Sequence, residues 1–427
     1  MDSQRNEISP PKLITALRGY NLLPAIVFLP TRRRCDEAAS AVAADKSQHA
    51  DAERQKKRQE IFDGFAAEYP EITGHKHAKV IVNAGVAAHH AGHIPSWKLL
   101  IEQMMSGGLL NALFATSTVA AGVDFPARTV VISNADTRGN EGWRPLAASE
   151  LQQMTGRAGR RGRDNVGFVV LVPGQFQDPR KIAELLKAPP DALESRFRAT
   201  YTSLLNLLDA FGNFAQVREF AGKSYAFTRD RRLTPKGVTL NSLWQPFDNR
   251  ARVLDHFGYI DHEAEAVTES GKWLADLRID RPLLVGEALK NGIFDQLTIA
   301  HAAGLMASVA SDADRSYGEM HASRKMGDVL ADLEDIVIKV SNVEWKNGVE
   351  PAEEINYSAA AAAERWTAGM QWDELVDRTR AEEGDLVRLL SRTGEALRQL
   401  ASLRTSNPTA AKIASAASDA ILREPVR

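Results

Sequence analysis

The segment QMTGRAGRRGRD at residues 153–164 combines four arginines with three glycines. Arginine presents a planar fork of N–H donors that matches phosphate oxygens, and glycine lets a backbone approach a ligand closely. The chemistry that this composition implies is the binding of a polyphosphate. A solvated cluster of surface arginines would have the same composition, so the surrounding sequence has to decide between the two.

A second polar segment, FATSTVAAGVDFPARTVVI, occupies residues 114–132, some thirty residues upstream. Its order is a strand, a hydroxyl-rich turn, Gly122, Asp124 and a second strand. Asp124 is therefore expected at the carboxyl end of a sheet, which is where open α/β folds bind their ligands. This arrangement favours a ligand site over a solvated cluster.

The first 180 residues alternate short apolar runs with amphipathic stretches, which predicts a parallel sheet covered by helices on both faces. The predicted strands are AIVFLP (25–30), KVIVNA (79–84), NALFAT (111–116), TVVISN (129–134) and GFVVLVP (167–173). Helices are predicted over 31–44, after a Thr31 cap, and over 95–107. The polar stretch 45–76 is expected to be a surface excursion without chemistry.

Beyond residue 181 the strand signal nearly vanishes and apolar residues recur at helical spacing. Residues 248–277 are predicted to form a helix, a short hairpin and a helix, an order that suits a winged helix. The turn-rich stretch just before, up to residue 247, is expected to be a linker. The final third is predicted to be helical, including 383–404, where leucines gather on one side.

Composition limits the remaining possibilities. A length of 427 residues suggests about three domains, and a net charge of −2 means that any polyanion must be met by a local patch. Cys35 is the one cysteine, which excludes a disulfide framework and a thiolate zinc site and fits a cytoplasmic protein. We expect no membrane segment. We also expect no metal site, because HEAEA at 262–266 lacks the second histidine of a zinc hydrolase motif.

Four segments in order resemble a known family: AIVFLPTRRRC, VAAHHAGHIP, ATSTVAAGVDFPA and QMTGRAGRRGRD. They are similar to motif IV, a His-His-Ala-Gly element, motif V and motif VI in the second RecA-like domain of superfamily 2 helicases. Later segments resemble the connector, winged helix and helical bundle of the superkiller-type DExH RNA helicases. The resemblance implies an α/β RecA-like parallel-sheet domain followed by a winged helix and an all-α bundle. The domain ranges would be 1–180, a connector and linker at 181–247, a winged-helix core at 248–282 and a helical bundle at 283–427.

The resemblance also assigns roles to residues of this chain. Arg157 and Arg160 would meet the γ-phosphate of ATP as catalytic arginine fingers. Further nucleotide contacts would come from Gln153, Gly156, Asp124 and Gly122. Contacts to the nucleic acid would come from Thr116, Ser117, Thr31, Arg32, His90 and Gly92. For His89 and His90, a hydrogen-bonded structural pair is the alternative.

Two motifs that a complete helicase needs are not found in this sequence. No G-x-x-x-x-G-K-[ST] phosphate loop is present, since the nearest string has Val217 in place of the first glycine. Asp36-Glu37-Ala38-Ala39 imitates a DExH box, but we expect it on a solvated helix surface. A first RecA-like lobe, in cis or in trans, would therefore have to supply the phosphate loop and the Mg²⁺ ligands.

The function expected from these observations is that of the carboxyl-terminal half of an ATP-dependent helicase acting on RNA or single-stranded DNA. Such a chain would use ATP and Mg²⁺ but would not hydrolyse ATP alone. The alternative is a non-catalytic module, derived from a helicase, that binds nucleic acid or protein. Salt-dependent binding of single strands without a first lobe would favour that alternative.

Overall fold

The protein was analysed as a computed structural model, which describes residues 7–49, 51–122, 126–139, 142–174, 177–191, 198–224, 240–311, 315–351 and 354–427. The chain divides into two compact units. The first, here the sheet unit, comprises Met1–Ala192 with Glu383–Asp385, and the second, here the helical unit, comprises Leu193–Glu382 with Leu386–Arg427. Each unit is described by itself.

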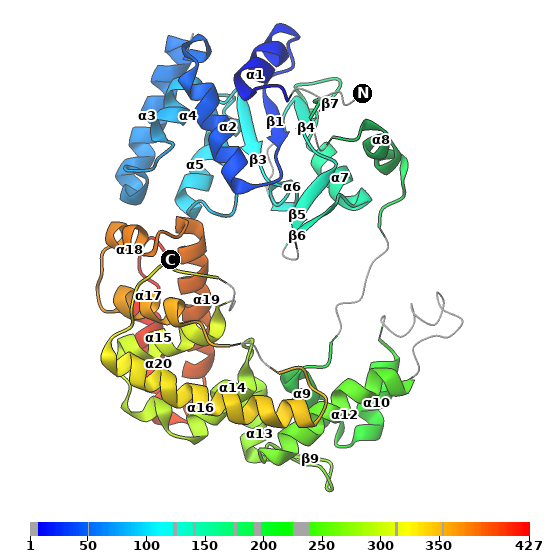
Figure 1. The fold of residues 1–427 in the computed structure, drawn as a ribbon, viewed down its shortest axis with the longest axis vertical. Helices are drawn as coiled ribbons and strands as arrows, with labels where there is room; N and C mark the ends of the chain where they lie inside the picture. Colours follow the sequence, from blue (N-terminus) through cyan, green and yellow to red (C-terminus); the bar gives the residue numbers. More distant parts are fainter. Residues whose placement is uncertain are drawn as a thin grey trace, which may run out of the picture. The chain divides into compact units, whose positions relative to one another are not determined.

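Within the described residues, the sheet unit contains a five-stranded parallel sheet in the order β2-β3-β1-β4-β7 (Figure 1). The strands are β1 (Ala25–Phe28), β2 (Val86–His89), β3 (Ala112–Ala115), β4 (Thr129–Ile132) and β7 (Phe168–Leu171). The parallel sheet predicted from the sequence is confirmed. The predictions for the strands in 25–30, 111–116, 129–134 and 167–173 are confirmed as well.

Both faces of the central strands are buried. Alternate residues point to opposite faces of a strand, and Val27 and Phe114 pack into a cluster with helices α1 (Pro10–Gly19) and α2 (Arg32–Ala44) on one face. Ile26 and Leu113, which point to the other face, are also buried. This double burial explains why the strands are continuous apolar runs. Helix α2 begins as expected, because the Thr31 hydroxyl accepts a hydrogen bond from the Arg34 amide at 3.3 Å.

The remaining elements of the sheet unit connect and cover the strands. They are η1 (Lys46–His49), α3 (Ala52–Glu68), η2 (Pro70–Ile72), α4 (Ala78–Ala84), α5 (Pro95–Ser106), α6 (Val119–Gly122), β5 (Asp136–Gly139), β6 (Gly142–Pro145), α7 (Ala148–Thr155) and α8 (Pro179–Lys187). Strands β5 and β6 form a separate antiparallel hairpin. The helix predicted over 95–107 is confirmed, since α5 spans Pro95–Ser106.

The prediction of a strand at 79–84 is wrong. This β-branched run forms helix α4, which ends at Gly85 in a left-handed conformation (φ 62°), and the strand β2 begins only at the next residue. The buried side chain of Arg58 on α3 explains the ending: it donates to the carbonyls of Val82 (2.7 Å) and Asn83 (3.2 Å) in the last turn of α4. Tertiary contacts of this kind override strand propensity. The buried Arg58 also corrects the expectation that 45–76 is a surface excursion, because this stretch contributes to the core.

The first part of the helical unit has the predicted helix, hairpin and helix. Its elements are α9 (Tyr201–Phe211), α10 (Phe214–Gly222), α12 (Leu240–His256), β8 (Ile260–Asp261), β9 (Ala266–Val267) and α13 (Glu269–Asp276). Helix α12 already begins at Leu240, so the linker expected up to residue 247 ends earlier. Phe247 is buried and stacks on Trp244, which explains why this turn-rich sequence is helical. The assignment as a winged helix stays a prediction.

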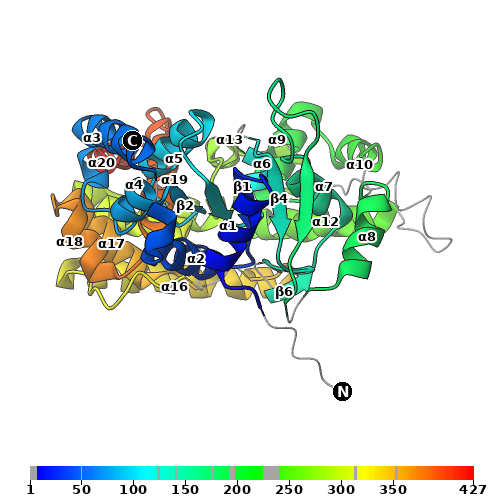
Figure 2. The same ribbon diagram turned by 90° about the horizontal axis from the view of Figure 1, so that it is seen from above.

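The rest of the unit is helical, as the sequence predicts (Figures 1 and 2). Its elements are α14 (Pro282–Lys290), η3 (Ile293–Gln296), α15 (Ile299–Ala310), α16 (Arg324–Lys346), α17 (Tyr357–Thr367), α18 (Trp372–Thr379), α19 (Glu383–Ala401) and α20 (Pro408–Ile421). The alanine run 359–363 is fully buried in α17, which packs closely on α15. None of the helices in the described part of the chain is both long and apolar enough to cross a membrane.

Replacing Arg58 by Met should destabilise the sheet unit by about 1–3 kcal/mol, because it leaves the buried carbonyls at the end of α4 without their donor. The free energy of unfolding from urea denaturation measures this change. Lys57→Met is the matched control on the same helix, since Lys57 is exposed and pairs with the exposed Glu53. If Arg58→Met lowered the free energy of unfolding no more than the control does, this explanation of where α4 ends would be wrong.

Candidate functional site

Three of the segments that the sequence singles out lie at one edge of the sheet. Thr31, His90 and Thr116 follow β1, β2 and β3 within three residues, and these strands are neighbours in the order β2-β3-β1. The parallel register aligns their last residues, with Ala115 paired to both Phe28 and His89. The carboxyl ends therefore meet at one edge, the position at which open α/β sheets bind ligands.

Hydroxyl groups lie at two points along this edge. The Thr31 hydroxyl caps α2, in whose first turn Arg32 lies, and the Thr116 hydroxyl is 2.9 Å from that of Thr118. Ser117 is half-buried, and its carbonyl accepts the amide of Ala120 at 3.0 Å, where the chain turns into α6. Hydroxyls and helix-start amides are groups that commonly bind phosphate oxygens of nucleic acids.

His90 and Gly92 are buried at this edge and not exposed on it. The ring of His90 is 1% exposed, and its Nε2 is 3.0 Å from Oδ1 of Asp36, while its Nδ1 accepts the Gly92 amide at 3.1 Å. Gly92 is buried too. The contact to nucleic acid that the sequence predicts for His90 would require the ring to leave Asp36. His90 is thus hydrogen-bonded within the protein, to Asp36 and Gly92 and not to His89 as in the predicted alternative.

The Gly-Arg loop (residues 156–167) lies at the other edge of the sheet, beside the amino-terminal ends of β4 and β7. Ala158 forms a parallel bridge with Ala127, two residues before β4, and the Phe168 amide donates to the Arg128 carbonyl at 3.1 Å. The Gly-Arg loop thus lies at the opposite edge from the carboxyl edge at which the sequence predicts Asp124. Asp124, predicted to touch the nucleotide, lies outside the described residues, and Gly122 is the last residue of α6.

Arg157 ties the Gly-Arg loop to the segment after β3. Its Nε and Nη2 donate to the Ala120 carbonyl in α6 at 3.0 and 2.6 Å. Gln153 is exposed in the last turn of α7, and Gly156 ends that helix by donating to the Gln152 carbonyl at 2.8 Å. The structure thus brings the predicted motif V and motif VI segments into direct contact.

Arg160 is held by Asp164 through a two-pronged ion pair. Nε lies 2.7 Å from Oδ2 and Nη2 lies 2.9 Å from Oδ1, and the Arg160 amide donates to Oδ2 at 3.0 Å. The Asp164 side chain is 3% exposed, and the hydrogen bonds from Arg160 lower its pKa to about 2. The same hydrogen bonding raises the pKa of Arg160. Arg128 is also near, 3.9 Å from Oδ1, so two guanidinium groups share one carboxylate.

Two glycines allow the Gly-Arg loop to close on itself. Gly159 has φ of 92°, which favours glycine, and its amide donates to the Ala127 carbonyl at 2.7 Å. A Cβ added at Gly167 would collide with the backbone of Ala158. The two glycines thus let the backbone of the loop approach its neighbouring segments closely, Gly159 at Ala127 and Gly167 at Ala158.

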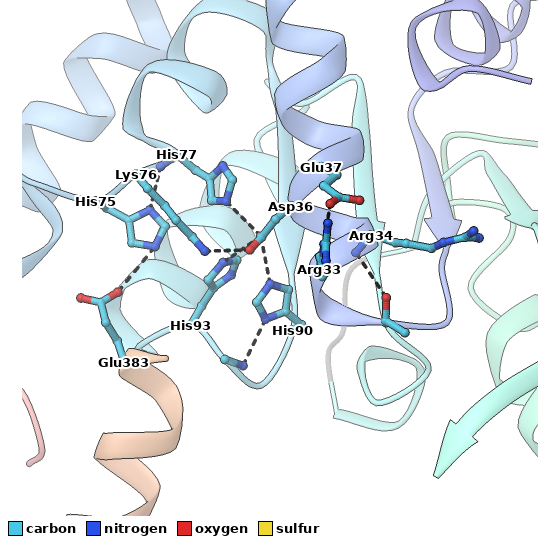
Figure 3. Close-up of polar contacts among 12 residues, drawn as sticks. Arg33, Arg34, Asp36, Glu37, His75, Lys76, His77, His90, His93 and Glu383 are labelled. Carbon is cyan, nitrogen blue, oxygen red and sulfur yellow. Dashed lines mark hydrogen bonds and ion pairs between the residues drawn. The ribbon is translucent and has the colours of Figure 1, made fainter. Parts of the chain in front are cut away.

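Sequence reasoning missed a buried cluster around Asp36 on α2 (Figure 3). Asp36 is not on a solvated surface, since His77 and His90 lie 2.9 and 3.0 Å from its Oδ1 and Lys76 lies 2.7 Å from its Oδ2. Burial alone would raise the pKa of Asp36, but the hydrogen bonds from the histidines and Lys76 outweigh it and hold this pKa well below its usual range. The strings HKH and HHAGH were the available signal, but their histidines are far from Asp36 in the sequence.

A second feature that was missed is the hairpin of β5 and β6. Trp143 on β6 is 57% exposed and pairs across the hairpin with Arg138. Exposed aromatic and guanidinium groups together are typical of surfaces on which nucleic-acid bases stack. The available signal was the string RGNEGWRP, in which Arg138 precedes and Trp143 and Arg144 follow the residues NEG.

Comparison with known proteins identifies both units. Residues 76–162 match the helicase conserved C-terminal domain, and residues 264–427 match the DSHCT (NUC185) domain. The chain is 37% identical to superkiller complex protein 2 of Homo sapiens over 205 residues, which are 46% of this chain and 16% of that protein. The chain thus contains two domains found in helicases and is similar to the carboxyl-terminal part of the superkiller-type DExH helicases of superfamily 2.

Two further relatives show how widely this family is distributed. The chain is 40% identical over 192 residues to the DExH-box ATP-dependent RNA helicase DExH15, chloroplastic, of Arabidopsis thaliana, covering 45% of this chain and 16% of that protein. It is 32% identical over 206 residues to the probable helicase HelY of Mycobacterium tuberculosis, covering 47% and 23%. The chain thus matches between 16% and 23% of the length of these three helicases, and it corresponds to their carboxyl-terminal part.

The ion pair between Arg160 and Asp164 should make the free energy of unfolding depend on pH in the acidic range. The Asp164 pKa is lower in the folded than in the unfolded chain, so the pair stabilises fully above about pH 5 and loses this contribution as the pH falls toward 2. The stability advantage of the wild type over Asp164→Asn should shrink by about 1 kcal/mol between pH 7 and pH 3. Denaturant unfolding at both pH values measures it, and an unchanged difference would show that the carboxylate is not stabilised by Arg160.

Proposed function

We propose that this chain works as the second-lobe and carboxyl-terminal part of an ATP-dependent helicase that moves along a single nucleic-acid strand. RNA is the proposed strand, because the Arabidopsis relative is by name an RNA helicase. The observation that carries the proposal is the Arg157 contact, which joins the arginine-rich loop to the segment that follows β3.

The carboxyl edge supplies the proposed track for the strand. Thr31, Arg32, Thr116 and Ser117 follow β1 and β3, which are neighbours in the sheet, so their hydroxyl and amide groups lie at the same edge. The Arg32 guanidinium donates to the Asp385 carboxylate at 2.7 and 3.3 Å, so it would have to exchange that carboxylate for a phosphate. Such groups bind phosphates without reading base sequence. His90 and Gly92 are proposed to support this edge from below. A charge of −2 for the whole chain makes a local track of this kind necessary.

Arg157 and Arg160 are the proposed arginine fingers, with Gln153, Gly156, Gly122 and Asp124 nearer the rest of the nucleotide. The contacts of both arginines use Nε and Nη2, and among the described residues no hydrogen bond engages Nη1 of either. Each guanidinium is therefore oriented by the protein while one nitrogen remains for a phosphate oxygen. Since Arg160 and Arg128 share the single carboxylate of Asp164, the loop keeps a net positive charge.

The first RecA-like lobe completes the proposed machine, in cis or in trans. It would contribute the phosphate loop and the carboxylate that holds Mg²⁺, while ATP binding would bring the Gly-Arg loop onto the γ-phosphate. In the helical unit, we propose that residues 248–282 form a winged helix that supports the bundle. Movement of the Arg157 contact on hydrolysis would pass directly to α6 and the turn of Thr116.

Arg160→Ala should lower nucleic-acid-stimulated ATP hydrolysis by at least about 100-fold, since an arginine finger contributes about 10³ to 10⁵ in rate. The assay uses the full chain joined to a first RecA-like lobe, with and without single-stranded RNA. Arg161→Ala is the matched control in the same loop, because Arg161 is exposed, and its rate should stay within about threefold of the wild type.

Equal rates for Arg160→Ala and the wild type would exclude the arginine-finger role. An assembly that binds RNA in a salt-dependent way but never hydrolyses ATP would instead favour the non-catalytic binding module. A parallel assay with single-stranded DNA decides which nucleic acid stimulates the enzyme.

A further inference from the structure

The cluster around Asp36 joins three separate segments of the sheet unit. Asp36 lies in the first half of α2, His77 immediately precedes α4, and His90 and His93 lie in the turn between β2 and α5. The four side chains converge on one point, as Figure 3 shows. The imidazoles are at most 5% exposed, so the cluster is buried.

The distances match those between the ligands of a bound metal ion. Nε2 of His77, His90 and His93 lies 2.9, 3.0 and 3.5 Å from Oδ1 of Asp36. A tetrahedral zinc ion with bonds of about 2.0–2.2 Å separates its ligand atoms by about 3.3 Å. Ligand atoms of Asp36, His90 and His93 also lie within 4.8 Å of one another. A small outward movement of Asp36, His90 and His93 therefore makes room for an ion, and His77, which lies outside this group, has to move closer to become a ligand.

Hydrogen bonding alone leaves several nitrogens of the cluster unsatisfied. Both ring nitrogens of His93, and Nδ1 of His77, are buried without a hydrogen-bond partner in the described part of the chain. A buried polar atom without a partner is costly. A cation at the centre of the cluster would bind the lone pair of His93 Nε2, which hydrogen bonds within the cluster do not use.

We propose that Asp36, His90 and His93 bind a zinc ion, with His77 as the fourth ligand. Three imidazoles and one carboxylate suit Zn²⁺, whereas Mg²⁺ and Ca²⁺ prefer oxygen ligands. Four protein ligands close the coordination sphere, which is the arrangement of structural zinc sites. The ion would fix α2 and the turn after β2 to the start of α4. This proposal does not depend on the proposed helicase function.

One contact has to change when the ion binds. The Gly92 amide donates to Nδ1 of His90, so Nε2 is the protonated nitrogen of that ring. A metal-bound imidazole carries its proton on the other nitrogen and donates it to an acceptor. Zinc binding through Nε2 of His90 therefore requires the ring proton to move from Nε2 to Nδ1, and the Gly92 amide, which can no longer donate to Nδ1, turns away. Lys76, whose side chain is 59% exposed, can move from Asp36 into water.

The experiment uses the full chain, stripped with EDTA and then titrated with ZnCl₂. We expect one equivalent of zinc to remain after gel filtration, measured by elemental mass spectrometry. His93→Ala and Asp36→Asn should each weaken zinc binding in calorimetry by at least about tenfold. His49→Ala is the matched control, because His49 lies outside the cluster and contacts the Ala43 carbonyl. It should bind zinc like the wild type.

The proposal would be overturned if the wild type retained less than about a fifth of an equivalent of zinc, or if the wild type and both cluster variants bound zinc with equal affinity. If the variants do not fold, Co²⁺ binding to the wild type decides. Intense visible absorption, typical of tetrahedral Co²⁺ with nitrogen and oxygen ligands, supports the site, and the weak spectrum of an octahedral ion overturns it.

Discussion

Parallel pairing of β1 with both β3 and β4 is the constraint on which the sheet unit depends. Ala25 aligns with Ala112 on one side and with Thr129 on the other. Because all five strands run in one direction, chain segments far apart in sequence must leave the sheet at the same edge. The hydroxyl-bearing turns after β1 and β3 are consequently neighbours, whatever their distance along the chain. The arginine loop returns to the opposite edge, and Arg157 connects it to α6 after β3.

That connection explains how a short helix can matter to both edges. Helix α6 has four residues, too few to be stable by itself. Its Ala120 carbonyl accepts two donors from Arg157, and this contact supplies what internal helical hydrogen bonds cannot. The orientation of Arg160 is fixed separately by Asp164, so the loop holds its two principal arginines by different means. Arg157 is attached to α6, and Arg160 is attached to the loop itself.

The sequence predicted the strands well where burial on both faces demanded apolar runs, as in 25–28 and 129–132. It failed at 79–84, where the same residue types form α4, because the deciding partner is Arg58 on another helix. The arginine-rich loop stood out by its local composition, and its interpretation as motif VI came from its order after three other segments. The environment of Asp36 was not, since it depends on His77, His90 and His93, which approach it only after the chain has folded. Local patterns thus revealed groups that act together within one segment, and missed those assembled from several.

Gly167 shows that the arginine loop is constrained beyond its arginines. Gly167 lies so close to the backbone of Ala158 that even one methyl group on its Cα would not fit. Directed evolution of this loop therefore has uneven freedom. Libraries that vary the exposed Arg161 or Arg163 can retain folded members, whereas those that randomise position 167 will lose nearly all of theirs before any selection for activity begins.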